Sequence, residues 1–320
     1  MYHYVLFCKF DLLNKIVDSL PSETIKMLSL PRACQNFNDI MQLQVDLRKE
    51  GQNLDRFRNN FKCTTKNDKN KVSFPEPILS EVDCLVEDYM EDSKPISEYL
   101  FDDSSAGMTV RRKLAGPLLR AFLQMVFMDN FIHCDLHPGN ILVRKTKTLP
   151  TTKSWWDSVV SSDEGKDTFI DGEDKYTIIF LDAGIVTTLN DNDQQNLKDL
   201  FKAVILNNGE EAGRLMVERA RFERCSSIEG GVEKFSQGIA DIVSEFHDRR
   251  KHGLTLGVVR IGTLLGRVLE LCRLHQVEID PAMANVVMST LVLEGLGRAL
   301  EPDLNLFDIA LPFVLGRGKV

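Results

Sequence analysis

The sequence has no excess of positive charge. Lysine and arginine together number 39 and aspartate and glutamate 47, so the formal net charge at pH 7 is -8. Non-specific binding of nucleic acid needs a basic surface, because much of the affinity comes from neutralising phosphates. The chain also has no zinc-ligand spacing and no interleaving of basic and aromatic residues. We therefore expect no nucleic-acid partner.

Paired cysteines are missing as well. Small secreted domains that depend on disulfides carry an even number of cysteines at regular spacing. Here the cysteines are scattered, odd in number and never arranged as Cys-x-x-Cys: Cys8, Cys34, Cys63, Cys84, Cys134, Cys225 and Cys272. This pattern predicts reduced thiols, mostly buried, and no disulfide framework.

No stretch is long and apolar enough to cross a membrane. A spanning helix needs roughly 18 apolar residues, and the nearest candidate, residues 281–293, is shorter and contains polar side chains. Residues 1–20 have no signal-peptide pattern, and they carry Asp11 and Asp18 but no arginine, unlike a mitochondrial transit peptide. We expect no transmembrane segment and no targeting segment in this chain, so either it is cytosolic or its true N-terminus is missing.

The remaining composition is that of an ordinary globular protein, with 43% hydrophobic and 27% charged residues in a chain of 320. That length allows one or two domains. Apolar residues recur with a helical period along most of the chain, which predicts a mostly helical α+β fold. The expected helices cover residues 1–30, 37–61, 109–132, 193–206, 210–221, 232–246, 254–274 and 281–300. Shorter strands are expected at 82–89, 141–143 and 176–180, with a polar insertion at 144–175.

The most informative stretch is HCDLHPGN, residues 133–140, between the long apolar helix and the strand at 141–143. Kinase-like phosphotransferases use a loop of this kind. An aspartate accepts or orients the proton of the substrate hydroxyl, and an asparagine five residues later binds magnesium. Asp135 and Asn140 have this spacing. They are therefore the candidate catalytic residue and a candidate metal ligand.

A second acidic group follows the apolar run 176–180. The sequence LDAG, residues 181–184, predicts a strand that ends in an Asp-x-Gly turn. Kinases place their second metal-binding carboxylate in such a turn. An isolated His-x-Asp could arise by chance, but the matching Asn140 and the acid Asp182 together argue against chance. We therefore expect magnesium and ATP as cofactors, with Asp182 as the second metal ligand.

Glu50 lies in a densely charged part of the predicted helix 37–61. A solvated helix face explains it if the helix is considered alone. The alternative is the helix glutamate of a kinase, which pairs with the lysine that holds the nucleotide phosphates. Both interpretations stay open at this stage.

These motifs resemble the aarF-domain (UbiB-type) atypical kinase family, and most closely its animal aarF-domain-containing kinase 2 subgroup. The resemblance covers residues 12 to 315 approximately. It rests on HCDLHPGN and LDAG, on VDLRKEGQN at 45–53, and on LEGLGR at 293–298. It implies a protein-kinase-like fold with Mg-ATP in the cleft, mitochondrial residence, and a role in ubiquinone biosynthesis with lipid or protein partners.

The resemblance also assigns roles and a division into domains. Asp135 matches the catalytic aspartate, Asn140 and Asp182 match the metal ligands, and Glu50 matches the helix glutamate at the nucleotide. Residues 1–95 correspond to a partial N-lobe-like region. Residues 96–320 correspond to a helical C-lobe that carries the loop, the insertion, the metal-binding turn and extra C-terminal helices.

The sequence departs from the family pattern ahead of Glu50. The family carries a Lys-x-Gly-Gln motif, an alanine-rich nucleotide loop and a strand lysine in a Val-Ala-x-Lys setting. This chain contains none of them, and Lys9 is a poor substitute for the strand lysine. We therefore expect the chain to be N-terminally incomplete, as a truncated gene model or a short isoform would be.

Three functional interpretations follow. The first is an ATP-dependent atypical kinase or ATPase, which in this chain would bind ATP poorly and turn over slowly or not at all. The second is a non-catalytic pseudokinase that binds lipids or partners, favoured by the absent lysine. The third is a phosphotransferase resembling aminoglycoside and choline kinases, disfavoured by the Ala183-Gly184 turn and by residues 48–53 and 295–298. The phosphoryl acceptor is not readable from the sequence.

Overall fold

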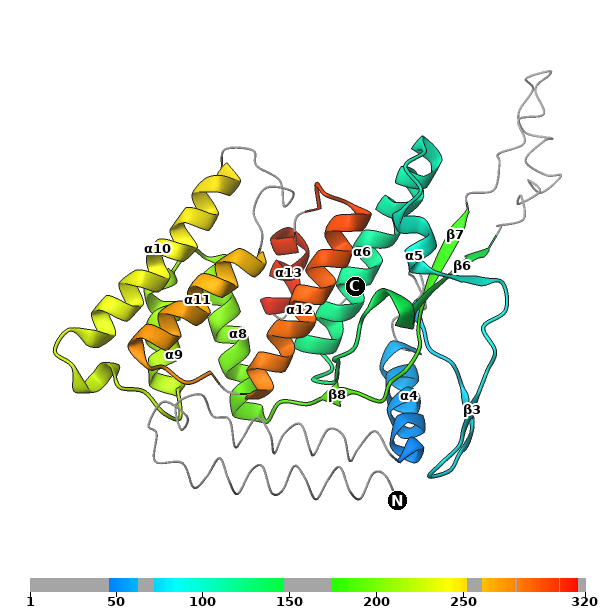
Figure 1. The fold of residues 1–320 in the computed structure, drawn as a ribbon, viewed down its shortest axis with the longest axis horizontal. Helices are drawn as coiled ribbons and strands as arrows, with labels where there is room; N and C mark the ends of the chain where they lie inside the picture. Colours follow the sequence, from blue (N-terminus) through cyan, green and yellow to red (C-terminus); the bar gives the residue numbers. More distant parts are fainter. Residues whose placement is uncertain are drawn as a thin grey trace, which may run out of the picture.

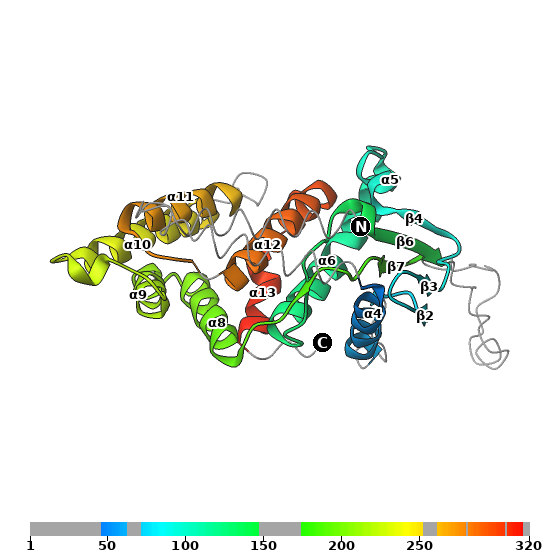
Figure 2. The ribbon, with the colours of Figure 1, turned by 60° about the horizontal axis from the view of Figure 1, so that its bottom comes forward.

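A computed structural model describes residues 46–62, 72–146, 174–251, 261–279, 281–304 and 306–315 (Figure 1). These residues form a mostly helical fold with a small mixed sheet. Seen from two directions, the sheet and helix α4 lie at one end of the molecule and helices α9 to α11 at the other (Figures 1 and 2). Helices α6 and α12 lie between these two ends.

Helix α6, Ser105–Phe127, is the central element of the core. The Ser104 side chain caps its N-terminus by accepting a hydrogen bond from the Gly107 N–H at 3.0 Å. Most of its residues from Leu114 onward are buried, in agreement with the apolar sequence. The predicted helix 109–132 was too long at its C-terminal end. The chain turns after Phe127 and forms the short strand β5, Ile132–His133.

The main sheet has the strand order β1-β7-β6-β4. Its strands are β1 Val72–Ser73, β4 Ser93–Pro95, β6 Ile141–Thr146 and β7 Lys175–Phe180. Strands β6 and β7 are antiparallel, with Val143 opposite Ile178, and their buried residues belong to the core around α6. The strands expected at 141–143 and 176–180 are therefore present, and both are longer than expected. Their ends take in residues at both edges of the expected insertion 144–175, whose central part, residues 147–173, lies outside the described residues.

Two further pairs of strands are short. Strand β2, Pro77–Ser80, pairs antiparallel with β3, Leu85–Glu87, and β5 pairs antiparallel with β8, Val186–Thr187. The single strand expected at 82–89 was wrong, because residues 81–84 form the turn of the β2–β3 hairpin. The Glu81 N–H closes this turn by donating to the Cys84 carbonyl at 2.8 Å.

Helix α4, Leu47–Lys62, packs against the β2–β3 hairpin and the main sheet. Phe57 is its most buried aromatic residue, with an exposed fraction of 0%. Its ring stacks on Phe74 at a centroid distance of 4.9 Å and meets Phe131 at 4.5 Å. Through these rings, α4 packs against the end of β1 and against the segment that leads into the loop 133–140. The first ten residues of the expected helix 37–61 are not confirmed: residues 37–45 lie outside the described residues, and Asp46 precedes α4.

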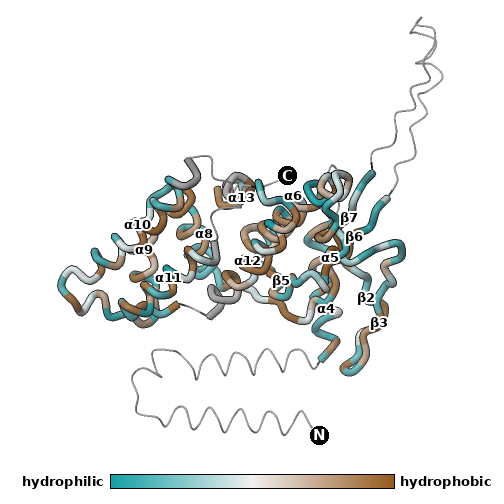
Figure 3. Tube along the Cα trace, turned by 45° about the horizontal axis from the view of Figure 1, so that its top comes forward, coloured by the Kyte–Doolittle hydropathy of each residue, from teal (hydrophilic) through white to brown (hydrophobic). Residues whose placement is uncertain are grey.

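The C-terminal half is helical, as predicted. Its helices are α8 Asp191–Ile205, α9 Gly209–Arg219, α10 Gly231–Lys251, α11 Ile261–His275, α12 Pro281–Leu300 and α13 Leu306–Val314. Helices α12 and α13 pack on α6, whereas α9, α10 and α11 share a second core with α8. The apolar colouring of α6 and α12 in Figure 3 agrees with their central position. The short helices α5 Ile96–Leu100, η1 Pro138–Asn140 and η2 Cys225–Ser227, and α13, were not predicted as separate elements.

Other expectations can be checked only in part. The described cysteines are all free thiols; Cys225 and Cys272 are buried, Cys134 is half-buried and Cys84 is exposed. Within the described ranges, no helix is long and apolar enough to span a membrane. The helix expected at 1–30 and the alternative lysine Lys9 lie outside the described residues.

Candidate functional site

The loop 133–140 is held between α6 and the main sheet by backbone hydrogen bonds. The Phe131 N–H donates to Met125 O at 3.0 Å, and the Cys134 N–H donates to Ile185 O at 3.0 Å. At the other end of the loop, the Leu181 N–H donates to the Asn140 carbonyl at 2.8 Å. Two segments some forty residues apart in sequence are thereby fixed next to each other.

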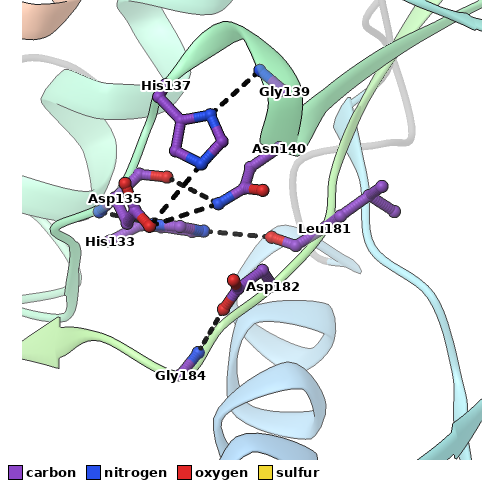
Figure 4. A network of polar contacts seen from close by, with 8 residues as sticks. All are labelled: His133, Asp135, His137, Gly139, Asn140, Leu181, Asp182 and Gly184. Atoms are coloured by element: carbon purple, nitrogen blue, oxygen red, sulfur yellow. Dashed lines mark hydrogen bonds and ion pairs between the residues drawn. The ribbon is translucent and has the colours of Figure 1, made fainter. Parts of the chain in front are cut away.

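Asp135 and Asn140 lie within hydrogen-bonding distance across this loop (Figure 4). The Asn140 Nδ2 donates to the Asp135 carbonyl oxygen at 3.2 Å and approaches its Oδ2 at 3.4 Å. The amide nitrogen is therefore used within the loop, which leaves the amide oxygen for a ligand. This arrangement agrees with the spacing argument that selected the two residues.

His133 connects the loop to the Asp182 turn. Its side chain is completely buried, and its Nδ1 accepts a hydrogen bond from the Asp135 N–H at 3.2 Å. The Nε2 lies 3.1 Å from the Leu181 carbonyl, so Nε2 carries the proton and donates. Burial lowers the pKa of His133, which favours the neutral ring that this pattern requires. The sequence reasoning gave His133 no role, although a histidine two residues before the aspartate was the available signal.

His137 lies on the other side of Asp135. Its Nδ1 accepts from the Gly139 N–H at 3.0 Å, and its Nε2 is 3.7 Å from the Asp135 Oδ2. Because Nδ1 acts as an acceptor, Nε2 carries the proton and faces the Asp135 carboxylate. His137 therefore lies beside the Asp135 carboxylate, a neighbour that the sequence reasoning also missed.

Asp182 adopts a left-handed backbone conformation, with φ of 39°. Its Oδ1 accepts from the Gly184 N–H at 3.0 Å. A Cβ on Gly184 would lie 3.2 Å from this oxygen, closer than most Cβ contacts, and 3.8 Å from Glu50 Oε2, an ordinary van der Waals distance, so a side chain here would crowd the Asp182 carboxyl group. Strained backbone of this kind costs of order 1–3 kcal/mol and is concentrated at functional sites.

Glu50 reaches the same turn from helix α4. The neighbouring residue Asn53 fixes the helix to it, since its Nδ2 donates to the Ala183 carbonyl at 2.8 Å. Burial, together with the negative charges of Asp182 and Glu87, raises the pKa of Glu50 to about 7. In the part of the chain that the structure describes, the charged groups that act on Glu50 are thus acidic, not the lysine that a kinase would supply. The solvated-face interpretation of Glu50 is wrong, because the side chain is half-buried against the turn.

We expect Glu50→Gln to change the pH dependence of stability. Native Glu50 binds its proton more tightly than unfolded Glu50, so between pH 4.5 and 7 the wild type loses stability as the pH rises. Glutamine removes this loss. Each pKa unit corresponds to about 1.4 kcal/mol, and solvent screening of a half-buried group reduces the total to roughly 1–2 kcal/mol at pH 8. The free energy of unfolding, measured with urea in EDTA, should rise at pH 8 and stay nearly unchanged at pH 4, below the unfolded pKa.

The control is Glu81→Gln, at an exposed position on the β2–β3 hairpin. It should leave the difference between the two pH values as in the wild type. Equal stability of Glu50→Gln and the wild type at pH 8 would contradict the acidic surroundings of Glu50.

The chemistry of the side chains fits a magnesium ion. Asn140 and Asp182 offer hard oxygen ligands, and magnesium sites in phosphotransferases commonly use one or two protein groups and complete their shell with phosphates and water. In the described ranges, no three His, Cys, Asp or Glu side chains form a group able to hold a metal by themselves. The residues therefore fit an ion that is shared with a nucleotide better than a fully protein-bound one.

A loop aspartate, an asparagine five residues later and an acid after a strand form the arrangement found in kinase-like phosphotransferases. The comparison with protein families agrees with this class. The chain belongs to the ABC1 atypical kinase-like family, whose model matches residues 7–216, and the UbiB helical domain model matches residues 249–305.

Several relatives are similar over most of this chain. A mitochondrial ABC1 family protein of Saccharomyces cerevisiae is 34% identical over 312 residues, covering 91% of this chain and 46% of the relative. A mitochondrial ABC1 family protein of Schizosaccharomyces pombe is 35% identical, covering 94% and 43%. A probable serine/threonine-protein kinase of Dictyostelium discoideum, abkC, is 30% identical, covering 91% and 46%. The chain thus spans less than half the length of these curated relatives.

Among solved structures, the Rv3197–erythromycin complex from Mycobacterium tuberculosis matches with a TM-score of 0.46 and 12% identity, covering 85% of this chain and 57% of that one. The family models and the sequence relatives confirm the family. Membership of the animal aarF-domain-containing kinase 2 subgroup stays a prediction.

Proposed function

We propose that this chain forms the metal-binding side of the nucleotide site of an atypical kinase, with Mg-ATP as its ligand and phosphoryl transfer or ATP hydrolysis as its chemistry. The mitochondrial names of two relatives support the same location here. The family resemblance supports a link to ubiquinone biosynthesis. In this proposal α4 with β1 to β3 is part of an N-lobe, and α6 with the later helices is the C-lobe.

The observation that carries the proposal is the contact between Asp135 and Asn140, together with the hydrogen bond from Leu181 N–H to Asn140 O. Magnesium, when bound, neutralises phosphate charge. Asn140 and Asp182 would hold it, and Asp135 would accept or orient the proton of the attacking hydroxyl or water. His137 would orient the Asp135 carboxylate, which its Nε2 faces at 3.7 Å. The neutral His133 fixes the loop against Leu181.

A titration of the 320-residue chain with Mg-ATP tests the proposal. We expect weak binding, on the order of millimolar, that disappears in EDTA, because the described charged groups that act on Glu50 are acidic and include no cation that could fix the phosphates. Isothermal titration calorimetry, repeated with ADP, measures it. No magnesium-dependent binding at any concentration would overturn the proposal, and micromolar affinity would overturn the expected weakness.

A second function is favoured by a specific observation. Glu50 faces the acids Asp182 and Glu87, an arrangement suited to a protein that does not turn over nucleotide. In this alternative the chain is a non-catalytic module that binds a lipid or a partner protein. Release of phosphate from ATP that falls to background in Asp135→Asn would decide for catalysis. A background rate in the wild type would decide for the module only together with the absence of magnesium-dependent ATP binding, because the first function allows slow or no turnover in this chain.

A further inference from the structure

A cavity of about 340 Å³ lies among the helices on the side of α6 away from the candidate nucleotide site. Residues of α6, α8, α9, α10, α11 and α12 line it. In sequence, α6, α8 and most of α9 belong to the kinase-like residues 7–216, and α11 and α12 belong to the helical-domain residues 249–305, whereas most of α10 lies between the two segments. The cavity is therefore lined by residues of both matched segments.

The lining is predominantly apolar. Phe122 and Val126 contribute from α6, Leu200 from α8, Val243 from α10 and Val268 from α11. An apolar cavity of about 150 Å³ already stays dry and accepts benzene, and ligand sites usually span about 300–1,000 Å³. This cavity is large enough for a molecule well over the size of benzene, and its walls offer such a molecule hydrocarbon contact on several sides.

The charged groups that line the cavity are of both signs: Asp193, Arg219, Arg221, Glu278 and Glu294. Arg219 is engaged with Asp199 at 2.9 Å, Glu294 forms an ion pair with Arg298, and Asp193 accepts from the Asn190 side chain. Arg221 and Glu278 also have interactions within the protein, so the lining does not present a charge of one sign to an ionic head group. A neutral ligand suits this lining better than a fatty-acid anion or a cation does.

We propose that this cavity binds a neutral, single-chain apolar molecule that carries at most a small polar group such as a hydroxyl. The site is separate from the nucleotide site and does not require it. The cavity is nevertheless connected to the candidate nucleotide site through α6. Phe127, at the end of α6, lines the cavity, and its ring packs edge-on against Phe201 with the ring centroids 5.3 Å apart. The loop 133–140 begins only a few residues later.

Calorimetric titration of the full chain with 1-hexanol, 1-octanol and 1-decanol, without nucleotide, tests the site. We expect saturable binding that tightens about fourfold for each buried methylene. Val268→Phe should weaken 1-decanol binding at least tenfold by filling the cavity. Leu269→Phe introduces the same ring one residue further along α11 at a position that is 47% exposed and outside the lining, so it should bind like the wild type.

Circular dichroism shows whether Val268→Phe is folded, and Met216→Phe from α9 provides a second filling variant. A measurement that needs no substitution is methyl NMR of the wild type, in which 1-decanol should give nuclear Overhauser effects to Leu200 and Val243. Unsaturable heats, equal affinities in Val268→Phe and Leu269→Phe, or effects at other methyls would overturn the proposal. A wild-type dimer that Val268→Phe converts to a monomer would also overturn it, because the cavity would then be a contact between copies.

Discussion

Asp182→Asn is expected to abolish the magnesium-dependent binding of nucleotide. The substitution removes one of the two proposed protein ligands of the ion. Loss of a residue that merely supports a ligand costs about 10–100-fold in metal affinity, so loss of the ligand itself should cost more than about 100-fold. Asparagine tolerates the left-handed backbone at this position, where φ is 39°, so the turn should survive the change.

Line broadening by Mn²⁺ measures this effect directly. In the wild type, the NMR signals of residues around Asn140 and Gly184 should broaden at low Mn²⁺ concentration, and in Asp182→Asn they should stay sharp. Asp103→Asn is the matched control, because the Asp103 side chain is 90% exposed and pairs only with Arg111 among the groups described. If Asp182→Asn keeps the broadening and the nucleotide affinity, the metal site lies elsewhere.

Phe57→Ala should destabilise the fold by about 3–5 kcal/mol, the usual cost of removing a buried phenylalanine. The ring is fully buried and touches three other rings, those of Phe74, Phe131 and His133. A loss of this size is a large part of the 5–15 kcal/mol that typically stabilises a domain. Urea denaturation followed by circular dichroism should show the midpoint shifted to a much lower urea concentration.

The comparison for this variant is Phe101→Ala. The Phe101 ring is 84% exposed, so its removal should change the free energy of unfolding by less than about 0.5 kcal/mol. Equal effects of the two substitutions would show that the aromatic cluster does not hold α4 to the loop.

The sequence predicted the helices well because their apolar period is long and regular. Helix α12 was expected at exactly the residues observed, since Pro281 marks its start. Where tertiary contacts override the local pattern, the prediction failed. Residues 128–132 are apolar enough to continue α6, yet Ile132 and His133 pair with β8, and Asn130 takes a left-handed conformation that turns the chain. In the β2–β3 hairpin, apolar and polar residues alternate loosely along 82–89, and this pattern predicted a strand where the chain turns.

The candidate site was predictable where spacing carries chemistry. Asp135, Asn140 and Asp182 were selected by spacing and by position after a strand, and the structure places them around one loop and one turn. The contribution of His133 and His137 depends on which ring nitrogen faces which backbone group, and no sequence pattern encodes that. The approach of Glu87 to Glu50 depends on the course of the β2–β3 hairpin, so it could not be predicted from the sequence either.

The hydrogen bond from Leu181 N–H to Asn140 O has a consequence for how an ion would be captured. It joins the main chains that carry the two proposed ligands, so their spacing is set by the polypeptide backbone and not by flexible side chains alone. If Asn140 and Asp182 hold the ion as proposed, little conformational freedom would be lost on coordination. The rigidity of the sheet edge would then contribute to the affinity for the metal.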